Sequence, residues 1–109
     1  MKIQFNDIPE TVIPEFKGGE KEFRARMHTD PKIKIMRGLL CPGASIGMHS
    51  HTTSSEVIFI LSGCGKAICA DKEEILQPGE CHYCPKGGSH TLINDGDADL
   101  VFFAVVPEQ

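Results

Sequence analysis

The sequence predicts an all-β protein built from short strands. Segments in which apolar and polar residues alternate with a period of two recur along the chain, as expected of half-buried strands. Turn residues separate these segments at intervals of about 8–12 residues, a spacing typical of a small sandwich or barrel. Eleven glycines and seven prolines among 109 residues, with no long helical pattern, agree with this fold class.

The first strand signals lie in the N-terminal half. The stretch 20–30 alternates three apolar with three basic side chains: Phe23, Arg24, Ala25, Arg26, Met27 and His28. The alternation resumes at Lys32 to Lys34 with Ile33 and Ile35 on one face, and this strand ends before the turn dipeptide Pro42-Gly43. We therefore expect two adjacent strands here.

The second half of the chain holds shorter segments. Val57 to Leu61 is a continuous apolar run, as in a strand covered on both sides. Short strands are expected at 66–70, 74–76, 81–84 and 90–93, and Asn94 to Asp97 is a strong turn signal before a closing strand at 100–106. We expect a single domain over 1–109, with 1–20 as a peripheral strand or arm and loose ends at 1–20 and 107–109.

Charge and hydropathy exclude several function classes. The net charge of −4 and the absence of a Lys/Arg cluster argue against a nucleic-acid partner. No run of about 18 apolar residues predicts a transmembrane helix, so a membrane partner is also disfavoured. The first ten residues, MKIQFNDIPE, lack the apolar core of a secretory signal. We therefore expect a cytoplasmic protein whose partner is a small molecule.

The cysteines suggest reduced thiols. They are odd in number: Cys41, Cys64, Cys69, Cys81 and Cys84. A disulfide framework would leave one thiol unpaired, so a reducing compartment is the simpler interpretation. The C-x-x-C segment 81–84 suggests a redox or zinc site, but positions i and i+3 of a strand face opposite sides and no second C-x-x-C exists. We expect these thiols to act as small apolar side chains.

Histidines and one glutamate form the strongest candidate site. His49 and His51 are two positions apart, so on a strand both imidazoles project to one face. Glu56 follows a polar turn that can bring its carboxylate back toward them. His90 begins a later strand that can lie beside the first and supply a fourth ligand.

Two segments resemble the signature motifs of the cupin superfamily. The first is Gly43-x5-His49-x-His51-x4-Glu56-x6-Gly63, and the second is Gly79-x5-Pro85-x-Gly87-x2-His90-x3-Asn94. Every signature position is matched, and the fifteen residues between Gly63 and Gly79 resemble the spacing of small microbial single-domain cupins. The resemblance spans 43–94, the motif core.

The resemblance implies an antiparallel jelly-roll barrel, a double-stranded β-helix, with a metal in its interior. The ligands it implies are His49, His51, Glu56 and His90. Asn94 would be a structural residue that caps a turn through its side chain. The turn glycines it implies are Gly43, Gly63, Gly79 and Gly87.

Three imidazoles and one carboxylate favour a divalent transition metal. Mixed nitrogen and oxygen ligation suits Mn, Fe, Ni, Cu or Zn rather than Ca or Mg. Four protein ligands leave coordination positions open, as in catalytic sites. The residual charge of +1 favours a substrate that chelates through oxygen atoms.

Further residues are weaker candidates. His82 and Tyr83 adjoin the second motif, and one of them should face the interior, where it can act as a general acid or base; the alternative is a packed aromatic and a solvent-facing histidine. Arg24, Arg26 and His28 share a strand face that either orients an anionic substrate or is simply solvated.

Two functions therefore compete. The first is a mononuclear metal-dependent enzyme, similar to oxalate decarboxylases or dioxygenases, acting on a carboxylate, keto acid or sugar as a decarboxylase, dioxygenase, isomerase or lyase. The alternative is a non-catalytic module that binds or senses a small ligand. The resemblance also implies a homodimer.

Overall fold

The computed structural model describes residues 1–109 and is almost entirely β-strand, which confirms the expected fold class. The elements in chain order are η1 (Phe5–Asp7), β1 (Thr11–Pro14), η2 (Phe16–Gly18), β2 (Glu22–Thr29), β3 (Ile33–Leu40), β4 (Ser45–Ser50), β5 (Glu56–Ser62), β6 (Gly65–Cys69), β7 (Lys72–Leu76), β8 (Cys81–Cys84), β9 (Ser89–Ile93) and β10 (Leu100–Pro107). Neither of the 3-10 turns, η1 and η2, is long or apolar enough to cross a membrane.

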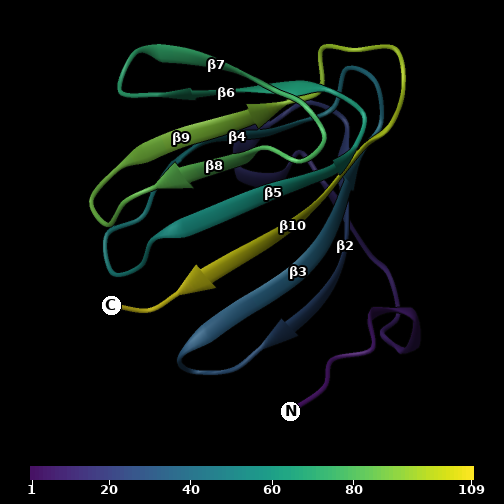
Figure 1. The fold of residues 1–109 in the computed structure, drawn as a ribbon, viewed down its shortest axis with the longest axis vertical. Coiled ribbons are helices and arrows are strands. Elements are labelled where there is room, and N and C mark those ends of the chain that lie inside the picture. Colours follow the sequence, from purple (N-terminus) through teal and green to yellow (C-terminus); the bar gives the residue numbers. More distant parts are fainter.

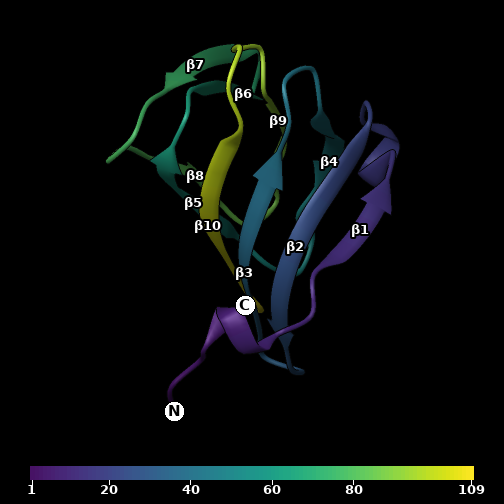
Figure 2. The same ribbon diagram turned by 90° about the vertical axis from the view of Figure 1, so that its right-hand side faces the viewer.

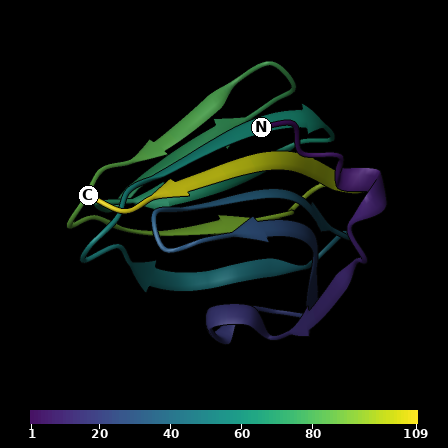
Figure 3. The same ribbon diagram turned by 90° about the horizontal axis from the view of Figure 1, so that it is seen from below.

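The strands form two antiparallel sheets that face each other as a jelly roll (Figure 1). The larger sheet has the order β1-β2-β3-β10-β5-β8, and the smaller has the order β4-β9-β6-β7. Figure 3 shows the same two layers from below, with the strands curving around a common interior. Because the chain crosses repeatedly between the sheets after β3, residues distant in sequence meet between them.

The interior is filled by one hydrophobic core. It contains 14 buried residues from both sheets, among them Leu100, Phe102 and Ala104 at alternate positions of β10. Phe102 stacks against Phe23 of β2 with ring centroids 6.0 Å apart. The period-two pattern seen in the sequence is therefore the pattern of burial, since alternate side chains of a strand face opposite sides.

The predicted strands are all present, and the bounds that matter most differ at the connection between β6 and β7. β6 ends at Cys69 and β7 already begins at Lys72, whereas the sequence predicts strands over 66–70 and 74–76. Ala70 and Asp71 form the turn with φ of 50° and 62°. Two consecutive positive φ values suit a two-residue hairpin turn, which normally carries Asn or Gly. Because neither Asn nor Gly occupies the turn, the sequence does not predict a two-residue hairpin at this position.

Both ends of the chain are attached to the sheets. Phe5 packs on Phe103 of β10, the Arg26 guanidinium donates to the Ile8 carbonyl, and β1 then pairs with β2. The N-terminal segment thus crosses the outer face of the larger sheet, in front of its strands in Figure 2. The expectation of a loose C-terminus is wrong, because the amides of Glu108 and Gln109 donate to the carbonyls of Lys32 and Thr53.

Asn94 ties three segments together, in the structural role that the resemblance implies. Its fully buried amide nitrogen donates to the carbonyls of Leu40 at 2.8 Å and Ala98 at 2.9 Å. Its amide oxygen accepts from the Gly96 N–H at 3.0 Å and so caps the turn before β10. One side chain therefore satisfies three backbone groups.

Asn94→Ala should lower the free energy of unfolding by about 2–4 kcal/mol, because it leaves buried backbone groups without partners. Urea denaturation of both proteins measures this difference. Asn6→Ala, at the other asparagine of the chain, which is exposed in η1, should change stability by less than about 0.5 kcal/mol. Equal stability of Asn94→Ala and the parent chain would contradict this role.

Candidate metal centre

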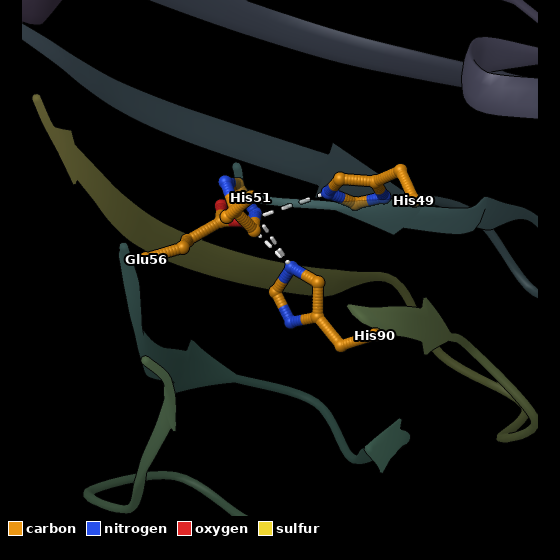
Figure 4. Close-up of side chains that lie close together, drawn as sticks. All are labelled: His49, His51, Glu56 and His90. Carbon is orange, nitrogen blue, oxygen red and sulfur yellow. Dashed lines mark hydrogen bonds and ion pairs between the residues drawn. The ribbon is translucent and has the colours of Figure 1, made fainter. Parts of the chain in front are cut away.

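Four side chains meet in the interior, as predicted from the motifs (Figure 4). His49 lies near the end of β4, His51 directly follows this strand, Glu56 begins β5, and His90 lies in β9. Their donor atoms all lie within 4.8 Å of one another. The three histidines belong to the smaller sheet and its edge, while Glu56 comes from the larger sheet, so the cluster bridges the two layers.

The donor atoms are closely spaced. Oε1 of Glu56 lies 2.9 Å from Nε2 of His90, 3.1 Å from Nε2 of His51 and 3.7 Å from Nε2 of His49. The Nε2 atoms of His51 and His90 are 3.0 Å apart. Ligand atoms about 2.1 Å from one ion and at right angles to each other are about 3 Å apart. The donor set therefore fits a single transition-metal ion.

A β-bulge directs His49 toward this cluster. In the pairing of β4 with β9, Ile46 is opposite Leu92 and His49 is opposite His90, so β4 has one extra residue between these pairs. Without the bulge, Ile46 and Met48 would share a face and His49 would point the other way. With it, Ile46 stays in the core, Met48 is exposed and His49 faces inward.

Gly47 lies within the bulge and against η2. A side chain at this position would collide with the carbonyl group of Lys17 in η2, so only glycine allows η2 to pack this closely on β4. The carbonyl of Gly47 accepts a hydrogen bond of 2.8 Å from Nδ1 of His49. The same residue therefore allows η2 to pack on the bulge and orients the imidazole.

The turn before β9 holds His51. The His51 amide donates to the carbonyl of Gly88 at 2.9 Å, and its carbonyl accepts from the amide of Gly87 at 2.6 Å. Gly87 has φ +88°, a conformation that favours glycine. The other three implied turn glycines, Gly43, Gly63 and Gly79, also have positive φ.

Each imidazole uses Nδ1 for an outer partner and directs Nε2 toward the centre. Nδ1 of His49 meets the Gly47 carbonyl, Nδ1 of His51 lies 3.0 Å from Oγ of Ser54, and Nδ1 of His90 lies 3.0 Å from Nε2 of His82. Such outer partners fix the ring orientation and the tautomer of ligating histidines. Three Nε2 lone pairs are thus available to an ion.

The cluster also shifts the proton affinities of its members. Burial acts to raise the pKa of Glu56, but its close contacts with the imidazoles of His49, His51 and His90 outweigh it and hold this pKa well below its usual range. Burial lowers the pKa of His90, although Glu56 opposes the shift. An ionised carboxylate and a neutral imidazole are the forms that bind a metal.

A cavity of about 240 Å³ opens beside the cluster. His49, His51 and Glu56 line it, together with Phe16 and Lys17 of the η2 segment. The Lys17 ammonium lies 5.5 Å from the centre of the Phe16 ring. Sequence reasoning missed Lys17, because no motif marks the N-terminal arm.

The weaker candidates lie elsewhere. His82 is buried, so one of these two residues does face the interior, but it lies behind His90 and does not line the cavity. Tyr83 points outward and is 58% exposed. Arg24 is held by Glu10 and Glu22 on the outer face of the larger sheet, and so belongs to a solvated face.

The cysteines are all free, as expected, but the expectation that they act as small apolar side chains is wrong for Cys64 and Cys81, which are exposed. Cys81 is exposed and Cys84 is buried, so the two ends of the C-x-x-C segment face opposite sides of β8. Burial, together with the neighbouring Cys69 thiol, raises the pKa of Cys84 to about 11. A protonated thiol is a poor metal ligand.

His49→Ala and His90→Ala should each sharply lower the metal content of the purified protein, because each removes one of four donors. Metal analysis after preparation without chelator measures this, and circular dichroism should show a retained β fold. Cys81→Ser and Cys84→Ser are the controls and should keep the metal content of the parent chain. Full occupancy in both histidine variants would refute the ligand assignment, and loss in a cysteine variant would revive the C-x-x-C site.

Comparisons with known proteins agree with the fold and the motifs. A chain named "Oxalate-binding protein" from Thermotoga maritima is 29% identical over 97% of this chain and 93% of its own length. The crystal structure of a "predicted oxalate decarboxylase" from Thermotoga maritima matches with a TM-score of 0.93 and 28% identity over the whole of both chains. A sugar phosphate isomerase of the cupin superfamily from Silicibacter pomeroyi matches with a TM-score of 0.81 and 18% identity, over all of this chain and 76% of its own, and shares the fold alone.

The family profile described as "Cupin domain" matches residues 37–106, which include both signature motifs and all four clustered side chains. This match covers more than half of the chain. The protein therefore belongs to the cupin family.

Proposed function

We propose that this cupin binds one divalent transition metal, Mn, Fe, Ni, Cu or Zn, through His49, His51, Glu56 and His90, and acts on a small carboxylate such as oxalate. The observation that carries the proposal is the convergence of four donor atoms within 4.8 Å beside a cavity of small volume. A bound ion would supply Lewis acidity to an oxygen-chelating substrate. The nearest reaction class is that of a decarboxylase, with dioxygenase, isomerase and lyase chemistry as other cupin reactions.

The charges around the cavity support an anionic substrate. Lys17 and Lys34 line the cavity together with Asp30 and Glu108. Asp30 is already occupied, since its carboxylate accepts from the amides of Lys32 and Ile33 and contacts His28. Glu56 and Glu108 also line the cavity, so the charge of its lining becomes positive only with a divalent ion at the four-donor cluster. The ammonium groups would then form charge-assisted hydrogen bonds with a carboxylate.

The division of roles follows from this geometry. Glu56 stays ionised because the imidazoles around it lower its pKa, and His49 forms part of the cavity wall. Lys17 would hold the end of the substrate that points away from the four-donor cluster. Oxalate decarboxylation breaks the carbon–carbon bond and consumes one proton, giving formate and carbon dioxide.

A second function, metal-dependent binding without turnover, is favoured by one observation. His82 and Tyr83, the general acid or base candidates of the sequence, do not line the cavity. The Thermotoga maritima relative is itself named for binding oxalate rather than for converting it. A sensor or binding module would need only the ion and the cationic groups.

Oxalate should bind to the Mn²⁺-loaded protein, and Lys17→Ala should weaken this binding about tenfold, because a charge-assisted hydrogen bond contributes about 1.5 kcal/mol. Isothermal titration calorimetry measures the affinity. Lys72→Ala, on β7 away from the cavity, is the matched control and should bind like the parent chain. Formate release by the parent chain separates an enzyme from a binding module, and oxalate binding of equal strength without metal would contradict the proposal.

We further propose that two copies pair through the outer face of the larger sheet, in a reducing cytoplasm. Phe59 of β5 and Tyr83 of β8 are 43% and 58% exposed on this face, an unusual exposure for aromatic side chains. The five free thiols suit a reducing compartment. Sedimentation equilibrium should give a dimer, and Phe59→Glu should give a monomer with its metal retained; a monomeric parent chain would contradict the pairing.

A further inference from the structure

A chain of three side chains runs from the candidate metal centre to the protein surface. Oε1 of Glu74 lies 2.7 Å from Nδ1 of His82, and Nε2 of His82 lies 3.0 Å from Nδ1 of His90. Nε2 of His90 faces Glu56 and His51. The His82 side chain is 1% exposed and the Glu74 side chain 52%, so the chain begins in solvent and ends inside the protein.

We infer that Glu74 and His82 are positioning residues for His90, which hold its ring and proton in the arrangement that frees Nε2 for a metal ion. The inference rests on the proposed metal site and adds to it two residues that are not signature positions of either motif. Neither residue touches the cavity, so both would act only through His90.

The hydrogen-bond directions follow from the chemistry of the three groups. A carboxylate only accepts, so Nδ1 of His82 must donate to Glu74. A neutral His82 then has an acceptor at Nε2, and this atom takes the proton on Nδ1 of His90. The lone pair of His90 is thereby left on Nε2, which points toward the other ligands.

The placement of the two residues explains why they can meet. Glu74 lies on β7, an edge strand of the smaller sheet. It pairs with the buried Ala67 of β6, so its side chain points to the inner side of the sheet. His82 lies on β8, an edge strand of the larger sheet, and pairs with the buried Ile58 of β5, so it also points inward. β7 and β8 belong to different sheets, so this contact links the two layers through side chains at one open side of the sandwich.

His90 differs in this respect from the other two histidines. The outer partner of His49 is a backbone carbonyl, and that of His51 is a serine hydroxyl. Both are neutral, whereas the chain behind His90 ends in an anion. A carboxylate behind a ligating imidazole makes the ring more basic and fixes its orientation, and removing such a partner typically weakens metal binding about 10–100-fold.

Glu74 has one competing explanation. A charged side chain that points inward from an edge strand also discourages unwanted strand pairing. That role would require the charge but no link to His90. Metal affinity therefore separates the two explanations.

Co²⁺ binding to three Glu74 and His82 variants tests the inference. Glu74→Gln keeps an acceptor but removes the charge, Glu74→Ala removes both, and His82→Gln interrupts the chain. Competition with a chromophoric chelator should give a Kd raised about tenfold in Glu74→Gln and more in the other two. Glu73→Gln is the matched control. Glu73 is the neighbour of Glu74, but its carboxylate forms an ion pair with Lys66 at 2.8 Å, so the Kd of this variant for Co²⁺ should be unchanged.

Nitrogen-15 NMR of the metal-free protein supplies a readout that a merely structural role would not change. The proton of both His82 and His90 should reside on Nδ1 in the parent chain, and Glu74→Ala should leave His82 in mixed tautomers. Kd values within twofold of the parent in Glu74→Ala and His82→Gln would overturn the inference and leave the metal site standing. A parent chain that binds no Co²⁺ would instead refute the metal site itself.

Discussion

The crowding of one carboxylate and three imidazole nitrogens between the two sheets is the constraint on which the site depends. Glu56 is buried, and Oε1 lies within 3.1 Å of the Nε2 atoms of both His51 and His90. A buried carboxylate is tolerated only when donors or a cation compensate for its lost hydration. The fold therefore places its most polar contacts where they need an ion or protons to balance them.

Rigid backbone devices maintain this crowding. The bulge at Gly47 turns His49 inward, and the turn at Gly87 binds the backbone of His51 on both sides. Both devices need glycine, one because a neighbouring carbonyl lies too close for a side chain and the other because φ is positive. The main chain around His49 and His51 is therefore held by contacts outside the four-donor cluster.

The surroundings of the four-residue cluster say more about which substrate it could select than the four side chains themselves do. Many cupins share the fold, which hosts unrelated reactions, so ligand identity alone does not select a substrate. In this chain the selective features are the cavity of about 240 Å³, the Lys17 ammonium at its wall and the Glu74–His82 contact behind His90. The first two are the basis of the proposed small anionic substrate, and the third contacts His90 from the side opposite Glu56.

The sequence by itself determined the fold class, nearly all strands and the four clustered residues, because period-two burial and motif spacing are local properties of the chain. Parity also separated Cys81 from Cys84 correctly. Only the tertiary structure decided the orientation of His49, since a one-residue bulge reverses the parity that Ile46 and Met48 would impose. It alone brought Lys17 from the N-terminal arm and Glu74 from an edge strand to the site, because such contacts between sheets depend on three-dimensional packing and leave no periodic signal in the sequence.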